Sequence, residues 1–122
     1  MTKKKKAAKK KTSKPKSGAA VPNRTITITG KFGGGVNNRV ILDVFRSNSL
    51  PHSFDFRKTF EGDFTETIND LKPGLLYKVD LTGHTTTQFD LTISGQFGGT
   101  NPIKDSFQNT GFSPGFSIKT NS

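Results

Sequence analysis

The residues best placed to do chemistry are nine lysines within the first 20 positions of the 122-residue chain. No acidic residue lies among them. Clustered ammonium groups without acidic neighbours bind phosphates and release the counterions that screen them. We therefore predict that this segment binds nucleic acid or another polyanion. The predicted binding residues are Lys3, Lys4, Lys5, Lys6, Lys9, Lys10, Lys11, Lys14 and Lys16.

The composition of the same segment predicts how it binds. Its other residues are mainly Ala, Ser, Thr, Pro and Gly, which bury too little apolar surface to offset the entropy of ordering. Residues 1–22 are therefore expected to form a disordered basic tail. Because the first 20 residues contain no aromatic residue or arginine, base readout is not expected, and binding should be non-specific. The alternative interpretation is a tail that only improves solubility.

Other side chains offer little chemistry. The chain has no cysteine, which excludes disulfides and thiolate sites. His52 and His84 are both expected in loops, where a single histidine is most often a solvated surface residue. Glu61, Asp63 and Glu66 cluster near a turn without the ligand spacing of an EF-hand calcium loop. We expect no catalytic site, no metal site and no cofactor.

Outside the tail, charge is balanced. Residues 21–122 contain ten Lys and Arg against nine Asp and Glu, so nearly all of the formal charge of +10 belongs to the tail. The length supports one domain. No apolar run approaches the length of a membrane span, and no apolar signal segment follows the lysines. The expected location is intracellular (cytoplasm or nucleus) or within an assembled virion, without secretion by a signal peptide.

Alternation of apolar and polar residues predicts β-strands from residue 24 onwards, the first of them a half-buried strand over residues 24–32. Residues 39–46 carry apolar side chains on both faces, which is typical of a central strand or of a strand that meets a partner. Lys58 falls on the aromatic face of its strand, so we expect a bulge or strand end near it. We expect a hairpin turn at residues 61–63. A second hairpin should join residues 75–82 to residues 89–97.

A corner motif links two of these strands. Leu71, Pro73 and Tyr77 have the spacing of a corner that connects the two sheets of a β-sandwich. Pro73 should end the first strand, and Gly74 can adopt the positive φ of the turn that follows. The ring of Tyr77 should be buried, with its hydroxyl group hydrogen-bonded back to the corner.

Residues 67–79 resemble the passage between the E and F strands of fibronectin type III domains. The family pattern Leu-x-Pro-x-x-x-Tyr falls on Leu71, Pro73 and Tyr77 over about 20 residues of similarity, although the chain lacks the core tryptophan common in that family. The resemblance implies an all-β, immunoglobulin-like antiparallel sandwich of about seven to eight strands. It implies architecture and not activity.

The domain division that follows is a tail (1–22), a β-sandwich (23–99) and a Phe/Gly-rich C-terminal segment (100–122). The last segment could form a final edge strand on its own domain. Alternatively, it could be an arm that docks on a partner through Phe107, Phe112 and Phe116. Residues 26–34 also resemble residues 91–99, which we attribute to similar strand-to-turn chemistry.

The favoured hypothesis is a non-enzymatic structural or adaptor protein. Its tail would hold nucleic acid or an anionic surface, and its sandwich and C-terminal arm would meet protein partners or further copies. Small sandwiches with basic arms suit a capsid or accessory component of a virus or phage particle. The rival hypotheses are a carbohydrate- or peptide-binding module, with loops 47–52 and 83–88 as its site, and a small non-specific DNA-binding protein.

Overall fold

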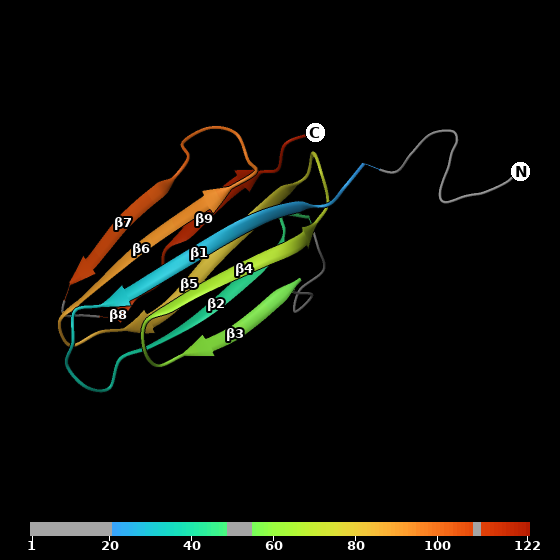
Figure 1. Ribbon diagram of the computed structural model, residues 1–122. Helices are drawn as coiled ribbons and strands as arrows, with labels where there is room; N and C mark the ends of the chain where they lie inside the picture. Colours follow the sequence, from blue (N-terminus) through green and yellow to red (C-terminus); the bar gives the residue numbers. More distant parts are fainter. Residues whose placement is uncertain (1–20, 49–54, 109–110) are drawn as a thin grey trace, which may run out of the picture.

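The computed structural model describes residues 21–48, 55–108 and 111–122. Over these residues the chain forms nine β-strands in two antiparallel sheets that pack face to face (Figure 1). No helix that could cross a membrane occurs in these ranges. The strands are β1 (Arg24–Phe32), β2 (Arg39–Arg46), β3 (Phe56–Phe60), β4 (Phe64–Leu71), β5 (Leu76–His84), β6 (Gln88–Gly95), β7 (Ile103–Gln108), β8 (Gly111–Phe112) and β9 (Gly115–Lys119).

The alternating pattern builds the core between the sheets. In β1, the side chains of Ile26 and Ile28 are fully buried, whereas the threonines between them lie on the outer face. The expectation of an all-β sandwich is confirmed, with nine strands rather than seven or eight. The buried apolar residues are Ile26, Ile28, Val40, Leu42, Val44, Phe64, Ile68, Leu71, Tyr77, Val79, Leu81, Phe89, Leu91, Ile93, Phe97, Phe112 and Ile118.

The sheet order places β2 where its apolar pattern predicted. One sheet has the order β4-β1-β6-β7, and the other has the order β3-β2-β5-β8, with β9 also paired to β5. β2 therefore lies between β3 and β5, and the prediction of a central strand is confirmed. The segment 100–122 supplies β7 to the first sheet and both β8 and β9 to the second.

Both predicted hairpins are wrong. β5 and β6 belong to different sheets, as do β3 and β4, so residues 85–87 and residues 61–63 connect the two layers. At the first crossing, Asn38 Oδ1 accepts a hydrogen bond from the backbone N–H of Thr86 over 3.3 Å and another from the hydroxyl of the buried Thr85 over 3.1 Å. At the second, the backbone N–H of Phe32 donates to Asp63 Oδ1 over 2.7 Å. Side-chain oxygens thus accept hydrogen bonds from backbone N–H groups that would otherwise lack a partner where the chain leaves a sheet.

The bulge expected near Lys58 is also absent from the described strands. β3 pairs with β2 in unbroken register from Phe56 to Phe60, and Lys58 points inward at the open side of the sandwich. Its Nζ lies 3.5 Å from Glu66 Oε1, on the edge strand of the other sheet, and 5.3 Å from the centroid of the Phe60 ring. These contacts let the strand continue with a charge on its inner face. Inward-pointing charges also discourage edge strands from pairing with other chains.

The two similar segments prove to be neighbours. β1 and β6 pair antiparallel at the centre of their sheet, with Ile28 opposite Ile93, its equivalent in the similarity. The resemblance is therefore a local two-fold relation between paired strands. Gly30 and Gly95 are also equivalent, and a Cβ atom at Gly30 would overlap the ring of Phe64. The motif thus includes a glycine that the close approach of an aromatic ring requires.

The two ends of the sandwich differ, and we call them the tail end and the far end. The tail end is where residue 21 joins the fold, beside the C-terminus in Figure 1, and includes Arg24, Arg46, Asp55, residues 70–78 and residues 117–122. The far end includes residues 31–39, 60–64, 84–90 and 105–112. The corner lies at the tail end, and most of the phenylalanine rings meet at the far end.

Candidate polyanion-binding end

The nine predicted lysines lie outside the described residues, but the point where their segment joins the fold is defined. Arg24, at the start of β1, donates from Nε to the carbonyl oxygen of Asn121 over 2.9 Å and from Nη1 to that of Pro22 over 2.6 Å. These bonds fix the backbone at residues 22–24 against the C-terminal strand. The lysine-rich segment is therefore attached at the tail end.

The corner at this end has the predicted geometry. The backbone N–H of Lys72 donates to the hydroxyl oxygen of Tyr77 over 2.8 Å, and the tyrosine is fully buried. Gly74 has a φ of +69°, the left-handed conformation expected after Pro73. The tyrosine corner predicted from sequence is confirmed.

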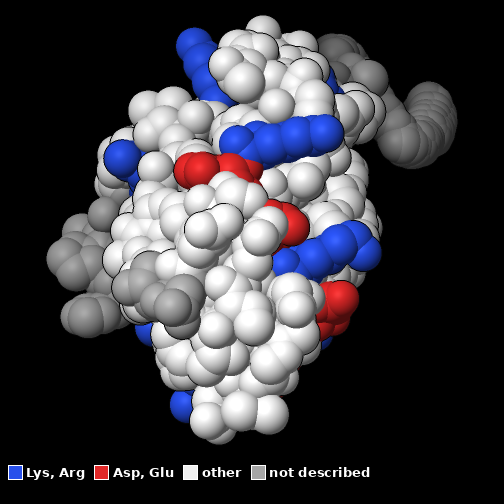
Figure 2. Space-filling model, turned by 90° about the vertical axis from the view of Figure 1, so that its left-hand side faces the viewer, with Lys and Arg blue, Asp and Glu red and all other residues white. Residues whose placement is uncertain are grey.

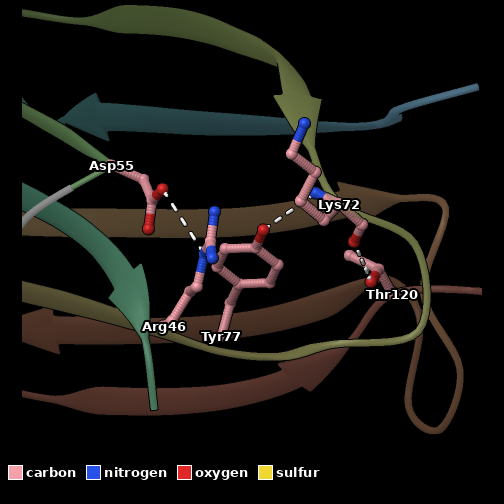
Figure 3. A network of polar contacts seen from close by, with 5 residues as sticks. All are labelled: Arg46, Asp55, Lys72, Tyr77 and Thr120. Atoms are coloured by element: carbon pink, nitrogen blue, oxygen red, sulfur yellow. Dashed lines mark hydrogen bonds and ion pairs between the residues drawn. The ribbon is translucent and has the colours of Figure 1, made fainter. Parts of the chain in front are cut away.

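Thr120 ties the corner to the C-terminal strand, a contact that sequence reasoning missed. Its hydroxyl donates to the carbonyl oxygen of Lys72 over 2.6 Å and accepts from the N–H of Leu75 over 3.0 Å. Both backbone polar groups of Lys72 are thus held, while its side chain extends away from Tyr77 and Thr120 (Figure 3). A rigid corner therefore presents a charged side chain.

Side-chain charge is unevenly distributed between the ends. The tail end carries five basic and two acidic side chains, whereas the far end carries two basic and four acidic ones. Seen from the far end, the acidic and basic side chains lie close to one another (Figure 2). The tail-end residues are Arg24, Arg46, Lys72, Lys78 and Lys119, with Asp55 and Asp70. The far-end residues are Lys31 and Arg39, with Glu61, Asp63, Asp90 and Asp105.

Two hollows flank Leu76 at the tail end. The larger, of about 670 Å³, is lined by Leu76, by polar residues and by two glycines of the loop after β6. The smaller, of about 250 Å³, lies between Arg46 and the exposed Leu75 and Leu76. The residues of the larger hollow are Leu76, Gly98, Gly99, Ser117, Lys119, Thr120, Asn121 and Ser122.

The acidic groups with shifted pKa values lie away from this end. Burial raises the pKa of Asp43, the Arg57 guanidinium 3.0 Å away lowers it, and the cross-strand Asp80 raises it, with burial the largest effect. Hydrogen bonds, first from the Ser106 hydroxyl and then from the Gln88 amide, lower the pKa of Asp90. These shifts have structural causes in the outer faces of the sheets.

The candidate metal ligands are not brought together. Among the described residues, no group of three or more His, Cys, Asp or Glu side chains could hold a metal ion. Asp63 is used at the crossing to β4, and Glu66 pairs with Lys58. His84 ends β5 in register with Arg39, so its placement in a loop was wrong, although it is exposed. His52 lies outside the described residues.

The three phenylalanines considered for docking contact their own domain. Phe112 is buried, and its ring centroid lies 5.1 Å from those of Phe89 and Phe107. Phe107 and Phe116 are partly buried against the same core. The segment thus forms strands of the sandwich, as the first of the two alternatives expected. Docking on a partner through these residues stays a prediction.

Sequence reasoning did not predict that basic side chains gather at the tail end of the folded part. Its five charges lie on different elements between residues 24 and 119, and only the antiparallel pairing brings them to one end. The available signal was the position of each charge near a strand terminus. In comparisons with known proteins, no family model, no curated protein and no solved structure matches the chain.

Proposed function

We propose that the protein is a non-enzymatic structural or adaptor protein that its lysine-rich tail holds on nucleic acid without sequence preference. The observation that carries the proposal is the segregation of charge. Nine lysines precede residue 21 without an acidic residue, while the remainder holds ten basic and nine acidic side chains. Such a segment binds phosphates by counterion release, and a near-neutral sandwich remains available for other contacts.

The strand order supports an immunoglobulin-like interpretation of the sandwich. In immunoglobulin-like folds, strand B lies beside E, and strand C lies beside F. If β4 and β5 correspond to E and F on either side of the corner, then β1 and β2 take the positions of B and C. The next strand departs from this pattern, because strand G pairs with F in immunoglobulin-like folds, whereas β6 pairs with β1 in the other sheet and β8 and β9 lie beside β5. Folds of this kind commonly present loops and faces to other proteins. An accessory or capsid role in a virus or phage particle is the form of this proposal that we favour.

The test compares the full chain with a variant in which all nine tail lysines are glutamine. Binding to a mixed-sequence DNA duplex is measured over a salt series. If every tail lysine contacts a phosphate, the log–log slope of affinity against salt approaches about −8 and falls towards zero in the variant. Unchanged binding by the variant would refute tethering. Absence of DNA binding by either protein would favour the carbohydrate- or peptide-binding module.

A further inference from the structure

We propose that the tail end of the sandwich is itself a phosphate-contacting surface that continues the tail, so that the folded domain stands end-on against nucleic acid. This inference rests on the proposed function and adds the surface and the orientation. The contacting residues would be Lys72 and Lys119, with Arg24, Arg46 and Lys78 contributing positive charge.

Electrostatics favours this orientation. The five basic and two acidic side chains lie at the same end of the sandwich as Arg24, where the tail is attached. Phosphates bound by the tail are tethered to this end, and those that come within about 8–10 Å of it interact with its charges at moderate salt. The far end, with four acidic and two basic side chains, attracts the same phosphates less strongly.

The local structure supplies contacts as well as charge. Lys119 lines the larger hollow together with Ser117 and Asn121, whose side chains are exposed. Hydroxyl and amide groups beside a lysine are the donors that proteins use to bind phosphate oxygens. Lys72 projects from the corner whose backbone Tyr77 and Thr120 hold, so the backbone loses little further conformational entropy when the ammonium group binds.

The exposed leucines of this end argue for nucleic acid over an anionic membrane. Val21, Leu75 and Leu76 are 57%, 36% and 46% exposed, and three separate aliphatic side chains offer far less apolar area than the continuous apolar face with which an amphipathic helix enters a bilayer. Without substantial apolar insertion, attraction to lipid depends on charge alone. A hollow that places hydroxyl and amide groups beside a lysine suits a phosphodiester backbone better, and duplex DNA is the appropriate probe.

The experiment keeps the tail intact and removes two charges from one end at a time. The tail-end variant carries Lys72→Gln and Lys119→Gln, and the matched far-end variant carries Lys31→Gln and Arg39→Gln. Both pairs are exposed, and both variants lose the same net charge. The corner uses the backbone of Lys72 and not its side chain, so both variants should keep the thermal stability of the parent.

Affinity for a mixed-sequence DNA duplex over a salt series gives the answer. The proposal expects the slope to weaken by about 2 in the tail-end variant and to stay unchanged in the far-end variant. Equal changes in both variants would mean that only net charge matters, and unchanged slopes in both would mean that the tail acts alone. Either result would overturn the inference that the tail end contacts phosphates, but would not contradict the proposal that the lysine-rich tail binds nucleic acid. Effects seen with anionic vesicles and not with DNA would also overturn it.

Discussion

The two ends of the sandwich are held together by different interactions. At the tail end, Tyr77 and Thr120 form hydrogen bonds to the backbone of the corner. At the far end, the buried ring of Phe89 lies between four other phenylalanine rings, with centroid separations of 4.8 to 6.5 Å. Both ends have polar contacts and buried apolar side chains, but the corner with its tyrosine and threonine hydroxyls distinguishes the tail end, and the cluster of phenylalanine rings distinguishes the far end.

The difference shows how one small domain can combine stability with a charged surface. The rings of Phe64, Phe89 and Phe112 at the far end bury large apolar side chains in the core. The tail end needs only a few backbone contacts to keep its shape, so its exposed positions can carry lysine and arginine. Substitutions at the far end should therefore change stability most, and those at the tail end should change binding most.

The largest effect is expected from Phe89→Ala. The side chain is fully buried, and its removal leaves a cavity among four rings, which should lower the free energy of unfolding by about 3–5 kcal/mol. Urea denaturation measures the loss. Because such a loss can unfold a small domain, Phe89→Leu provides a milder test, with an expected cost of about 1.5 kcal/mol.

Phe107→Ala is the matched control for the aromatic cluster. Phe107 contacts the same cluster from edge strand β7 and is only partly buried, so its loss should cost clearly less than that of Phe89. Equal costs at both positions would show that the far end does not depend on a central ring. The proposed difference between the stabilising contacts of the two ends would then be wrong.

An intermediate effect is expected from Tyr77→Phe. The ring stays in place while the backbone N–H of Lys72 loses its acceptor, which should cost about 1 kcal/mol. Thr120→Val, which removes two bonds to the same corner, should cost a similar amount. Chemical denaturation of both variants, with the exposed Thr82→Val as control, measures the difference. A Tyr77→Phe variant as stable as the parent would mean that the corner bond contributes nothing.

Sequence reasoning located most strands because an alternating pattern reports which face of a strand is buried. The segments 24–32 and 39–46 agree with β1 and β2, and the corner spacing identified the contact between Tyr77 and Lys72. These features depend on neighbours within a few residues. Local information was sufficient for them.

Strand pairing could not be obtained in the same way. Consecutive strands are often neighbours, which favoured pairing β5 with β6, yet nothing in the alternation distinguishes a hairpin from a crossing between sheets. Lys58 was misread because its partner, Glu66, lies on the opposite sheet. The basic tail end was missed for the same reason, since Arg24, Lys72 and Lys119 meet only after the sheets assemble.

The smallest effect on stability is expected from Asp55→Asn at the tail end. Arg46 Nε lies 3.9 Å from Asp55 Oδ1, and the two side chains are 43% and 29% exposed, so loss of the pair should cost less than about 0.5 kcal/mol. The substitution also removes an acidic group from the basic end, which should tighten binding to DNA at low salt. Asp70→Asn, at an exposed position of the same end, is the control and should behave alike. A loss above 1 kcal/mol for Asp55→Asn alone would show that ion pairing, rather than the backbone contacts of Tyr77 and Thr120, holds this end together.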